Sequence, residues 1–259
     1  PTTITYNVCL SAFEKGWQWT KALCLMAEMR QRRIQADTIT YNASISAFEK
    51  GLQWARGLHL LAEMQGRLVR PSAITYNALI SACEKGRQWS RALPLLEEMR
   101  TIGLRPSVIT YSAAISACVA GRQWSQALHL LEQASPLEPN AITYSAAISA
   151  CSGGQLWPWA LGLLGEARRR GLRCDLIAYS ASIGACEPDR QWAQVLRLLD
   201  EMRQGAVQVN ATTYDSSLRT CPSEQEVRRI ASVFREAAAQ GIWQGKFLRG
   251  GFVSLRGRH

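Results

Sequence analysis

Long apolar runs are missing from this chain of 259 residues. The longest covers only a few residues, whereas a membrane helix needs roughly 18 or more, so no transmembrane segment is expected. Acidic residues are also scarce, because 20 Asp and Glu stand against 30 Lys and Arg, and the formal net charge is +10. This excess favours a polyanionic partner, although charge alone predicts only non-specific attraction.

Signatures of catalysis and metal binding are absent as well. The chain has three histidines and contains no Walker loop, GxSxG, HExxH or paired-carboxylate motif. Its eight cysteines include no CxxC pair, which argues against a zinc site. We therefore expect no enzyme activity, metal, cofactor or small-molecule substrate.

An internal repeat dominates what the sequence does contain. The seven tyrosines are spaced 35 residues apart, with one interval of 33: Tyr6, Tyr41, Tyr76, Tyr111, Tyr144, Tyr179 and Tyr214. Thirteen residues after each of the first six stands a tryptophan: Trp19, Trp54, Trp89, Trp124, Trp157 and Trp192. A fixed period of this size indicates a solenoid or a similar array.

One position of the repeat is typical of a packed core. Seven residues after each tyrosine stands either phenylalanine or cysteine: Phe13, Phe48, Cys83, Cys118, Cys151, Cys186 and Cys221. A position that accepts both residue types is an apolar packing position. Single cysteines that recur once per copy favour a reducing compartment over disulfide bonds.

Each copy predicts two short helices. In the third copy, Thr75 is expected to cap a helix from Tyr76 to about Lys85, which Gly86 ends. Its apolar face contains Tyr76, Leu79, Ile80 and Cys83. A second helix is expected from about Trp89 to Arg100. Its inner face contains Trp89, Ala92, Leu93, Leu96 and Met99, so we expect the repeated tryptophans to fill the core.

A pair of short amphipathic helices cannot bury its apolar stripe alone, so neighbouring copies must stack. We therefore expect an all-α solenoid of stacked antiparallel helix pairs over residues 1–242, followed by a basic tail or cap over residues 243–259. The chain begins inside a repeat and without Met, so we expect an upstream part, with any targeting peptide, to be missing.

The third copy reads ITYNALISACEKG, then ALPLLEEM, then GLRPS. With its 35-residue period, the chain resembles the pentatricopeptide repeat family over residues 1 to about 245, whereas tetratricopeptide repeats have a 34-residue period and other anchor residues. The resemblance implies a right-handed superhelix that binds single-stranded RNA, one base per repeat. It also implies a monomeric adaptor in a chloroplast or mitochondrion, with other RNA-processing proteins as further partners.

By the same resemblance, two polar residues of each copy read one base. The post-tyrosine readers directly follow the tyrosine: Asn7, Asn42, Asn77, Ser112, Ser145 and Ser180, with Asp215 in the seventh copy. The pre-tyrosine readers stand four residues before the next tyrosine: Asp37, Ser72, Ser107, Asn140, Asp175 and Asn210. Such residues are commonly plain helix caps. Their variation at one place of a regular repeat favours base reading.

The chemistry of the readers predicts a target. Uracil and guanine have a ring N–H that needs an acceptor, whereas cytosine and adenine have a bare ring nitrogen that needs a donor. Asp therefore suits uracil or guanine, and Asn or Ser suits cytosine or adenine. A post-tyrosine Asn leaves room for a pyrimidine and a Ser admits a purine. The hypothesis for copies one to six is 5′-U-Y-Y-A-G-A-3′, with cytosine favoured at both Y positions.

The resemblance assigns two further sets of residues. Isoleucines two residues before the tyrosine would clamp the bases, although a β-branched residue can also simply start a helix: Ile4, Ile39, Ile74, Ile109, Ile142 and Ile177. Lysines nine residues after the tyrosine would contact phosphates: Lys15, Lys50 and Lys85. Later copies have Ala120, Gly153 and Pro188 at that place, which weakens the phosphate assignment there.

Two other functions stay open from the sequence. A helical-repeat scaffold for proteins would lack salt-sensitive affinity for RNA. The chain could also be the targeting half of an RNA-processing enzyme, since some members of the family carry a nuclease or deaminase domain. Residues 243–259 are too short for such a domain and have no HxE or CxxC zinc signature, so it would lie outside residues 1–259.

Overall fold

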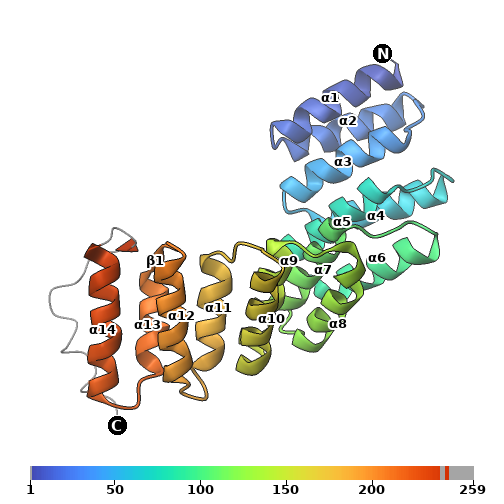
Figure 1. Ribbon diagram of the computed structural model, residues 1–259. Helices are drawn as coiled ribbons and strands as arrows, with labels where there is room; N and C mark the ends of the chain where they lie inside the picture. Colours follow the sequence, from blue (N-terminus) through green and yellow to red (C-terminus); the bar gives the residue numbers. More distant parts are fainter. Residues whose placement is uncertain (1, 240–242, 245–259) are drawn as a thin grey trace, which may run out of the picture. The chain divides into compact units, whose positions relative to one another are not determined.

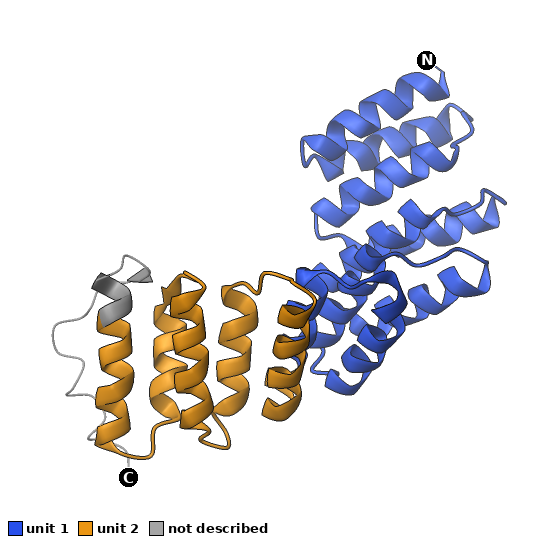
Figure 2. Ribbon diagram, viewed as in Figure 1, with its two compact units in different colours: residues 1–150 blue, residues 151–259 orange. Residues whose placement is uncertain are grey.

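The computed structural model of the chain describes residues 2–239, 243 and 244. Within them the chain forms fourteen α-helices, one short 3₁₀ helix and two strands of two residues each (Figure 1). Two compact units, residues 1–150 and residues 151–259, divide the chain (Figure 2). The predicted fold class, an all-α solenoid of stacked helix pairs, is confirmed.

Unit 1 contains four complete helix pairs. The first helices are α1 (Thr3–Lys15), α3 (Thr38–Lys50), α5 (Ala73–Lys85) and α7 (Val108–Ala120), and the second helices are α2 (Trp19–Gln31), α4 (Trp54–Gly66), α6 (Trp89–Thr101) and α8 (Trp124–Ala134). The first helices pack against one another in succession, while α2, α4 and α6 each pack against their own first helix and the next one. The short 3₁₀ helix η1 (Ser135–Leu137) follows α8, where the tyrosine interval falls to 33 residues.

Helix α9 (Ala141–Gly153) runs across the boundary between the units. Unit 2 contains α10 (Trp157–Arg169), α11 (Leu176–Cys186), α12 (Trp192–Gln204), α13 (Ala211–Arg219) and α14 (Glu224–Ala239). Strand β1 (Val209–Asn210) pairs in parallel with β2 (Trp243–Gln244). The boundary at residue 242 stays a prediction, and residues 245–259 lie outside the described part.

The apolar face of the first helices forms the core as predicted. Tyr76, Leu79, Ile80 and Cys83 are all fully buried. The Tyr76 hydroxyl donates to Glu98 Oε1 at 2.9 Å, so the buried phenol has a partner on the second helix of its own copy. On that second helix, Leu95 is buried and the predicted Leu93 is only half-buried.

The repeated cysteines are packing residues, as the sequence predicted for their position. Cys83, Cys118, Cys151 and Cys186 are fully buried, and Cys221 is half-buried. Burial raises the pKa of each of the four fully buried thiols to about 11. These thiols are therefore neutral at physiological pH and unreactive as nucleophiles.

The prediction that Thr75 caps the first helix is wrong. Helix α5 begins at Ala73 and its cap is Ser72, whose Oγ accepts a hydrogen bond from the Thr75 backbone N–H at 3.4 Å. Thr75 Oγ1 in turn accepts from the Ser72 backbone N–H at 2.9 Å. This reciprocal pair is a capping box in which Thr takes the place usual for Glu or Gln.

The prediction that the repeated tryptophans fill the core is also wrong. Five of the six are half-buried and Trp124 is 40% exposed. Three of them instead lie over a glycine of the next copy: Trp19 over Gly51, Trp54 over Gly86 and Trp89 over Gly121. A Cβ added to these glycines would lie only 2.4, 2.4 and 2.1 Å from the tryptophan Cδ1.

Gly86 is therefore required for contact with a neighbour and not for its backbone angles. Its φ is −80°, which any residue adopts, and the left-handed residue of this turn is Arg87 with φ of 55°. In unit 2, Asp189 stands at the corresponding place, and Trp157 Nε1 donates to its Oδ2 at 2.9 Å. A hydrogen bond thus replaces the glycine contact in that copy.

The turn after the second helix does require a left-handed residue, which is Gly103 in the third copy, with φ of +82°. Gly103→Ala should lower the free energy of unfolding by about 1 kcal/mol, because a Cβ is strained in this region. Gly66→Ala is the matched control. Gly66 ends α4 with open space around it, so alanine should be neutral or stabilising. Urea unfolding of both variants measures this, and equal losses would contradict the assignment.

Candidate functional site

The predicted readers meet at the starts of the first helices. Each post-tyrosine reader lies in a first helix, and each pre-tyrosine reader is the cap of the next one. Asn7 Nδ2 lies 3.2 and 3.3 Å from the two carboxylate oxygens of Asp37. Asn42 Nδ2 donates to Ser72 Oγ at 3.1 Å. Neighbouring copies therefore build these two reading pairs together.

A threonine hydroxyl is a third member of these pairs, and the sequence analysis missed it. Thr40, Thr75 and Thr110 donate to Oδ1 of Asn7, Asn42 and Asn77, each at 2.6 Å. This threonine directly precedes the tyrosine in six copies and is Ala178 in the other. Its recurrence was the available signal, but the sequence does not indicate that its hydroxyl reaches the preceding copy.

Helix capping fixes which group a pre-tyrosine Asn presents. Asn140 Oδ1 accepts from both the backbone N–H and the hydroxyl of Thr143, each at 3.0 Å. Asn210 Oδ1 accepts from the same two groups of Thr213, at 2.9 and 2.8 Å. Because these caps use only the amide oxygen, the amino group is left to donate. Capping and reading are therefore compatible roles of one residue.

A pre-tyrosine Asp presents an acceptor by the same logic. Asp37 Oδ1 accepts from Thr40 N at 2.8 Å, and Asp175 Oδ1 accepts from Ala178 N at 3.0 Å. Burial alone would raise the pKa of Asp37, but hydrogen bonds from the Thr40 backbone N–H and from Asn7 help to outweigh it, and the pKa is lowered. Asp37 is therefore ionised at neutral pH.

Two of the three post-tyrosine serines contact the threonine of the next copy. Ser112 Oγ lies 2.7 Å from Thr143 Oγ1, and Ser180 Oγ lies 2.9 Å from Thr213 Oγ1. Ser112 and Ser145 are only 9% and 6% exposed. The room for a purine beside the shorter side chain stays a prediction.

The predicted clamp residues are exposed in every copy. Relative exposures of 61 to 74% are found for Ile4, Ile39, Ile74, Ile109, Ile142 and Ile177. Ile4 precedes the Asn7 reader by three residues, so the two side chains lie on one face of α1. An exposed isoleucine in each copy offers an apolar surface beside the readers. The clamp itself stays a prediction.

Two of the predicted phosphate-binding lysines have carboxylate partners. Lys50 Nζ lies 3.1 Å from Glu14 Oε1, and Lys85 Nζ lies 2.8 Å from Glu49 Oε1. These ion pairs join neighbouring first helices, so a phosphate would compete with a glutamate for each lysine. The corresponding glutamate of the third copy is Glu84, and the residue that would pair with it in the fourth copy is Ala120 instead of a lysine. Burial raises the pKa of Glu84. Phosphate contact stays a prediction.

Two family models match this repeat. A model of the pentatricopeptide repeat domain matches residues 59–121 and 162–224, and a model of the PPR repeat family matches residues 1–50. The chain belongs to the pentatricopeptide repeat family. A comparison with curated protein sequences gave no match.

Solved pentatricopeptide repeat structures have the same fold. PPR10 from maize aligns with a TM-score of 0.62 at 25% identity, over 91% of this chain and 34% of that one. PPR10 in complex with an 18-nt psaJ RNA element gives 0.75 at 20% identity, over 93% and 35%. The PPR domain of Arabidopsis thaliana protein-only RNase P 1, in complex with tRNA, gives 0.59 at 16% identity, over 74% and 95%. This chain spans about a third of the length of PPR10.

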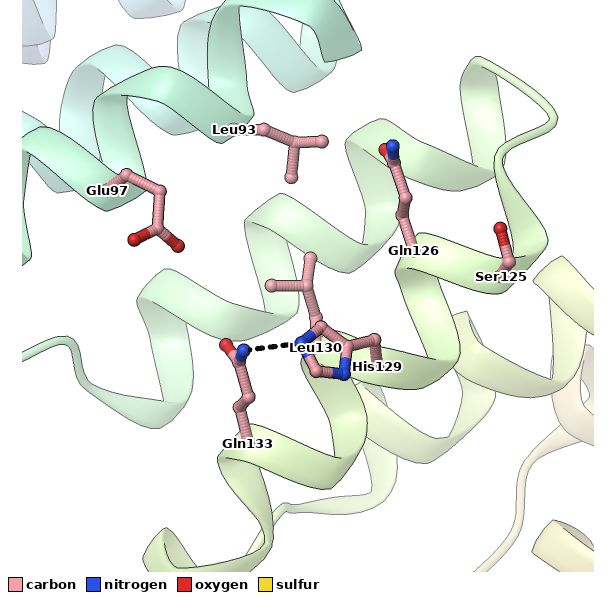
Figure 3. A pocket seen from close by; sticks show the side chains of 7 residues that line it. All are labelled: Leu93, Glu97, Ser125, Gln126, His129, Leu130 and Gln133. Carbon is pink, nitrogen blue, oxygen red and sulfur yellow. Dashed lines mark hydrogen bonds between the residues drawn. The ribbon is translucent and has the colours of Figure 1, made fainter.

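A separate hollow of about 440 Å³ lies between the second helices α6 and α8 of this pentatricopeptide repeat array (Figure 3). Its lining includes Leu93 and Glu97 of α6 and His129 and Gln133 of α8. Gln133 stands where three earlier copies have the glutamate that accepts from the tyrosine hydroxyl. The readers lie on the first helices, so this hollow is not part of the reading site.

The described part of the chain offers neither a metal site nor a membrane span. No group of three histidine, cysteine, aspartate or glutamate side chains there could hold a metal ion. None of the helices there combines the length and the apolar character that crossing a bilayer requires. The reading pairs and the exposed isoleucines are therefore the candidate site.

Proposed function

We propose that this pentatricopeptide repeat protein is an adaptor that binds a short single-stranded RNA and carries out no catalysis itself. One observation carries the proposal: in five of the six pairs a threonine hydroxyl links the two polar readers of adjacent copies, with an exposed isoleucine beside them. A helix cap alone needs no second polar side chain from the preceding copy. The similar structures of PPR10 in complex with a psaJ RNA element and of the RNase P 1 PPR domain in complex with tRNA give independent support.

The proposed target is 5′-U-Y-Y-A-G-A-3′, with cytosine favoured at both Y positions. Asp37 and Asp175 offer acceptors for U and G, and Asn140 and Asn210 offer amino groups for the two A positions. Ser72 Oγ already accepts from Asn42 Nδ2 and from the Thr75 backbone N–H. It also lies 3.2 Å from Thr75 Oγ1, so its hydroxyl proton would turn from Thr75 to the base, and a donor favours cytosine over uracil.

We further propose that the protein is a monomer in a chloroplast or mitochondrion, where it protects or remodels a transcript or recruits other RNA-processing proteins. This part rests on the family resemblance. Fractionation of cells that express the full-length protein tests the compartment, and recovery outside both organelles would contradict it.

Competition binding tests the proposed target. An unstructured RNA that contains 5′-UCCAGA-3′ should bind about tenfold more tightly than variants with one mismatch at positions one, four, five or six, because each mismatch costs roughly 1–3 kcal/mol. Affinity should fall as salt rises, since phosphate contacts release counterions. Equal affinity for all variants would contradict base reading. A lack of binding even at low salt would contradict RNA binding and favour the protein scaffold.

A further inference from the structure

The threonine before each tyrosine lies between the two readers in the first three copies. Thr40 is fully buried between Asn7 of the preceding copy and Asp37 of its own helix start. Thr75 and Thr110 hold the same place beside Asn42 and Asn77. Each threonine thus connects a reader of one copy to the helix cap of the next.

The hydrogen bonds define the direction of the hydroxyl. Thr40, Thr75 and Thr110 accept from the backbone N–H of the capping residue, at 3.2, 2.9 and 2.9 Å. A hydroxyl has one proton, and the shortest contact of each threonine oxygen, 2.6 Å, is to the Asn amide oxygen. Thr40 Oγ1 also lies 2.8 Å from Asp37 Oδ1, so this carboxylate competes for the proton in the first copy. The amide oxygen is therefore held against the threonine, and the amino group is turned toward the second reader.

This orientation has a consequence for recognition. The Asn42 amino group already donates one hydrogen to Ser72 Oγ. The Asn7 amino group lies 3.2 and 3.3 Å from the two carboxylate oxygens of Asp37, which can share one of its hydrogens. An amide has two N–H hydrogens, so the second one is available to an acceptor on the base. An amide rotated by half a turn would present its oxygen instead and would favour a different base edge.

Resting on the proposed RNA binding, we infer that Thr40, Thr75 and Thr110 are positioning residues for base reading. Each fixes the amide of the post-tyrosine Asn in the preceding copy as a hydrogen-bond donor. The recognition unit in these copies is therefore a set of three side chains. The post-tyrosine Asn comes from one first helix, and the threonine and the capping reader come from the start of the next first helix.

Thr40→Val tests the inference, because valine keeps the branched shape and removes the hydroxyl. Thr38→Val is the matched control, since Thr38 lies in the same helix turn and its hydroxyl contacts only Arg70 O among described partners, at 3.3 Å. Thr40→Val should lower the preference for U over A at the first base by roughly three- to tenfold, the worth of one hydrogen bond. Preference for A over G at the fourth base should not change.

The controls separate positioning from folding. Thr40→Ser restores a hydroxyl and should restore the preference at the first base, while Thr38→Val should leave every preference as in wild type. The inference is overturned if Thr40→Val weakens all RNAs equally with the first-base preference intact, because that outcome means a purely structural role.

A measurement without RNA keeps the inference separate from the proposed function. The Asn7 side-chain N–H resonances, identified by their loss in Asn7→Ala, should shift and exchange faster with water in Thr40→Val but not in Thr38→Val. If wild type binds no RNA, the proposed function fails, and the amide measurement still decides whether Thr40 orients Asn7. Unchanged Asn7 resonances in Thr40→Val would overturn the inference.

Discussion

Asn140→Asp should change the preferred fourth base of the RNA from adenine to guanine. Asn140 caps α9 through its amide oxygen and so directs its amino group to the base. Asp would keep an oxygen for the cap and replace the donor by an acceptor, which suits the ring N–H of guanine instead of the bare N1 of adenine. Each mismatch costs about 1–3 kcal/mol, so the ratio of the two affinities should change by roughly a hundredfold or more when both effects add.

The ratio is the quantity to measure, because an added carboxylate also weakens binding of every RNA through its charge. The reciprocal variant Asp175→Asn is the control, and it should move the fifth base from guanine toward adenine. Asp and Asn are about equally good caps, so both variants should unfold at the wild-type denaturant midpoint. An unchanged ranking of bases in a normally folded Asn140→Asp protein would contradict the reader assignment.

The repeat period predicted the fold because it identifies residues that have the same role. Tyr76, Leu79, Ile80 and Cys83 recur at helical spacing, so their burial follows from the sequence alone. A period does not say which residues of adjacent copies touch, because that depends on how far one helix pair is displaced against the next. The contacts of Thr40 with Asn7 and of Trp54 with Gly86 are both of this kind.

The wrong cap has a similar reason. A polar residue directly before an apolar helix face is the usual cap, and Thr75 stands there. Ser72 starts the helix one turn earlier. Ala73 and Ile74 lie between the two candidates, but Ile74 is exposed, so the buried apolar face from which the helix start was predicted does not extend back to Ser72. The readers themselves were predicted from a resemblance, and their pairing across copies could not be derived from spacing within one copy.

Gly121→Ala should lower the free energy of unfolding by about 2 kcal/mol, the usual cost of overpacking. The added Cβ would lie 2.1, 2.4 and 2.7 Å from Cδ1, Cγ and Nε1 of Trp89. Cδ1 and Cγ lie near the base of the ring, so a small rotation of its far end does not relieve the clash. Either the tryptophan leaves the interface or the two copies separate.

Gly16→Ala is the control, because Gly16 has the same position in the first copy and the three atoms nearest to an added Cβ, outside its chain neighbours, belong to Ala12 and Gln18 rather than to a tryptophan. Its φ of −84° is close to the −89° of Gly121, and neither value strains an alanine. Unfolding of both variants in urea compares them. If glycine were needed to end the helix, both substitutions would cost the same, and this result would contradict the role of the tryptophan.

A double-mutant cycle isolates the interaction between the two residues. Trp89→Ala removes the ring that the new Cβ meets, so adding Gly121→Ala to it should cost less than half of what the same substitution costs in wild type.

The sixth copy shows how a side chain is accommodated at this place, because Asp189 accepts a hydrogen bond from Trp157 Nε1. Gly121→Asp should therefore destabilise less than a substitution of similar size without an acceptor, such as Gly121→Leu.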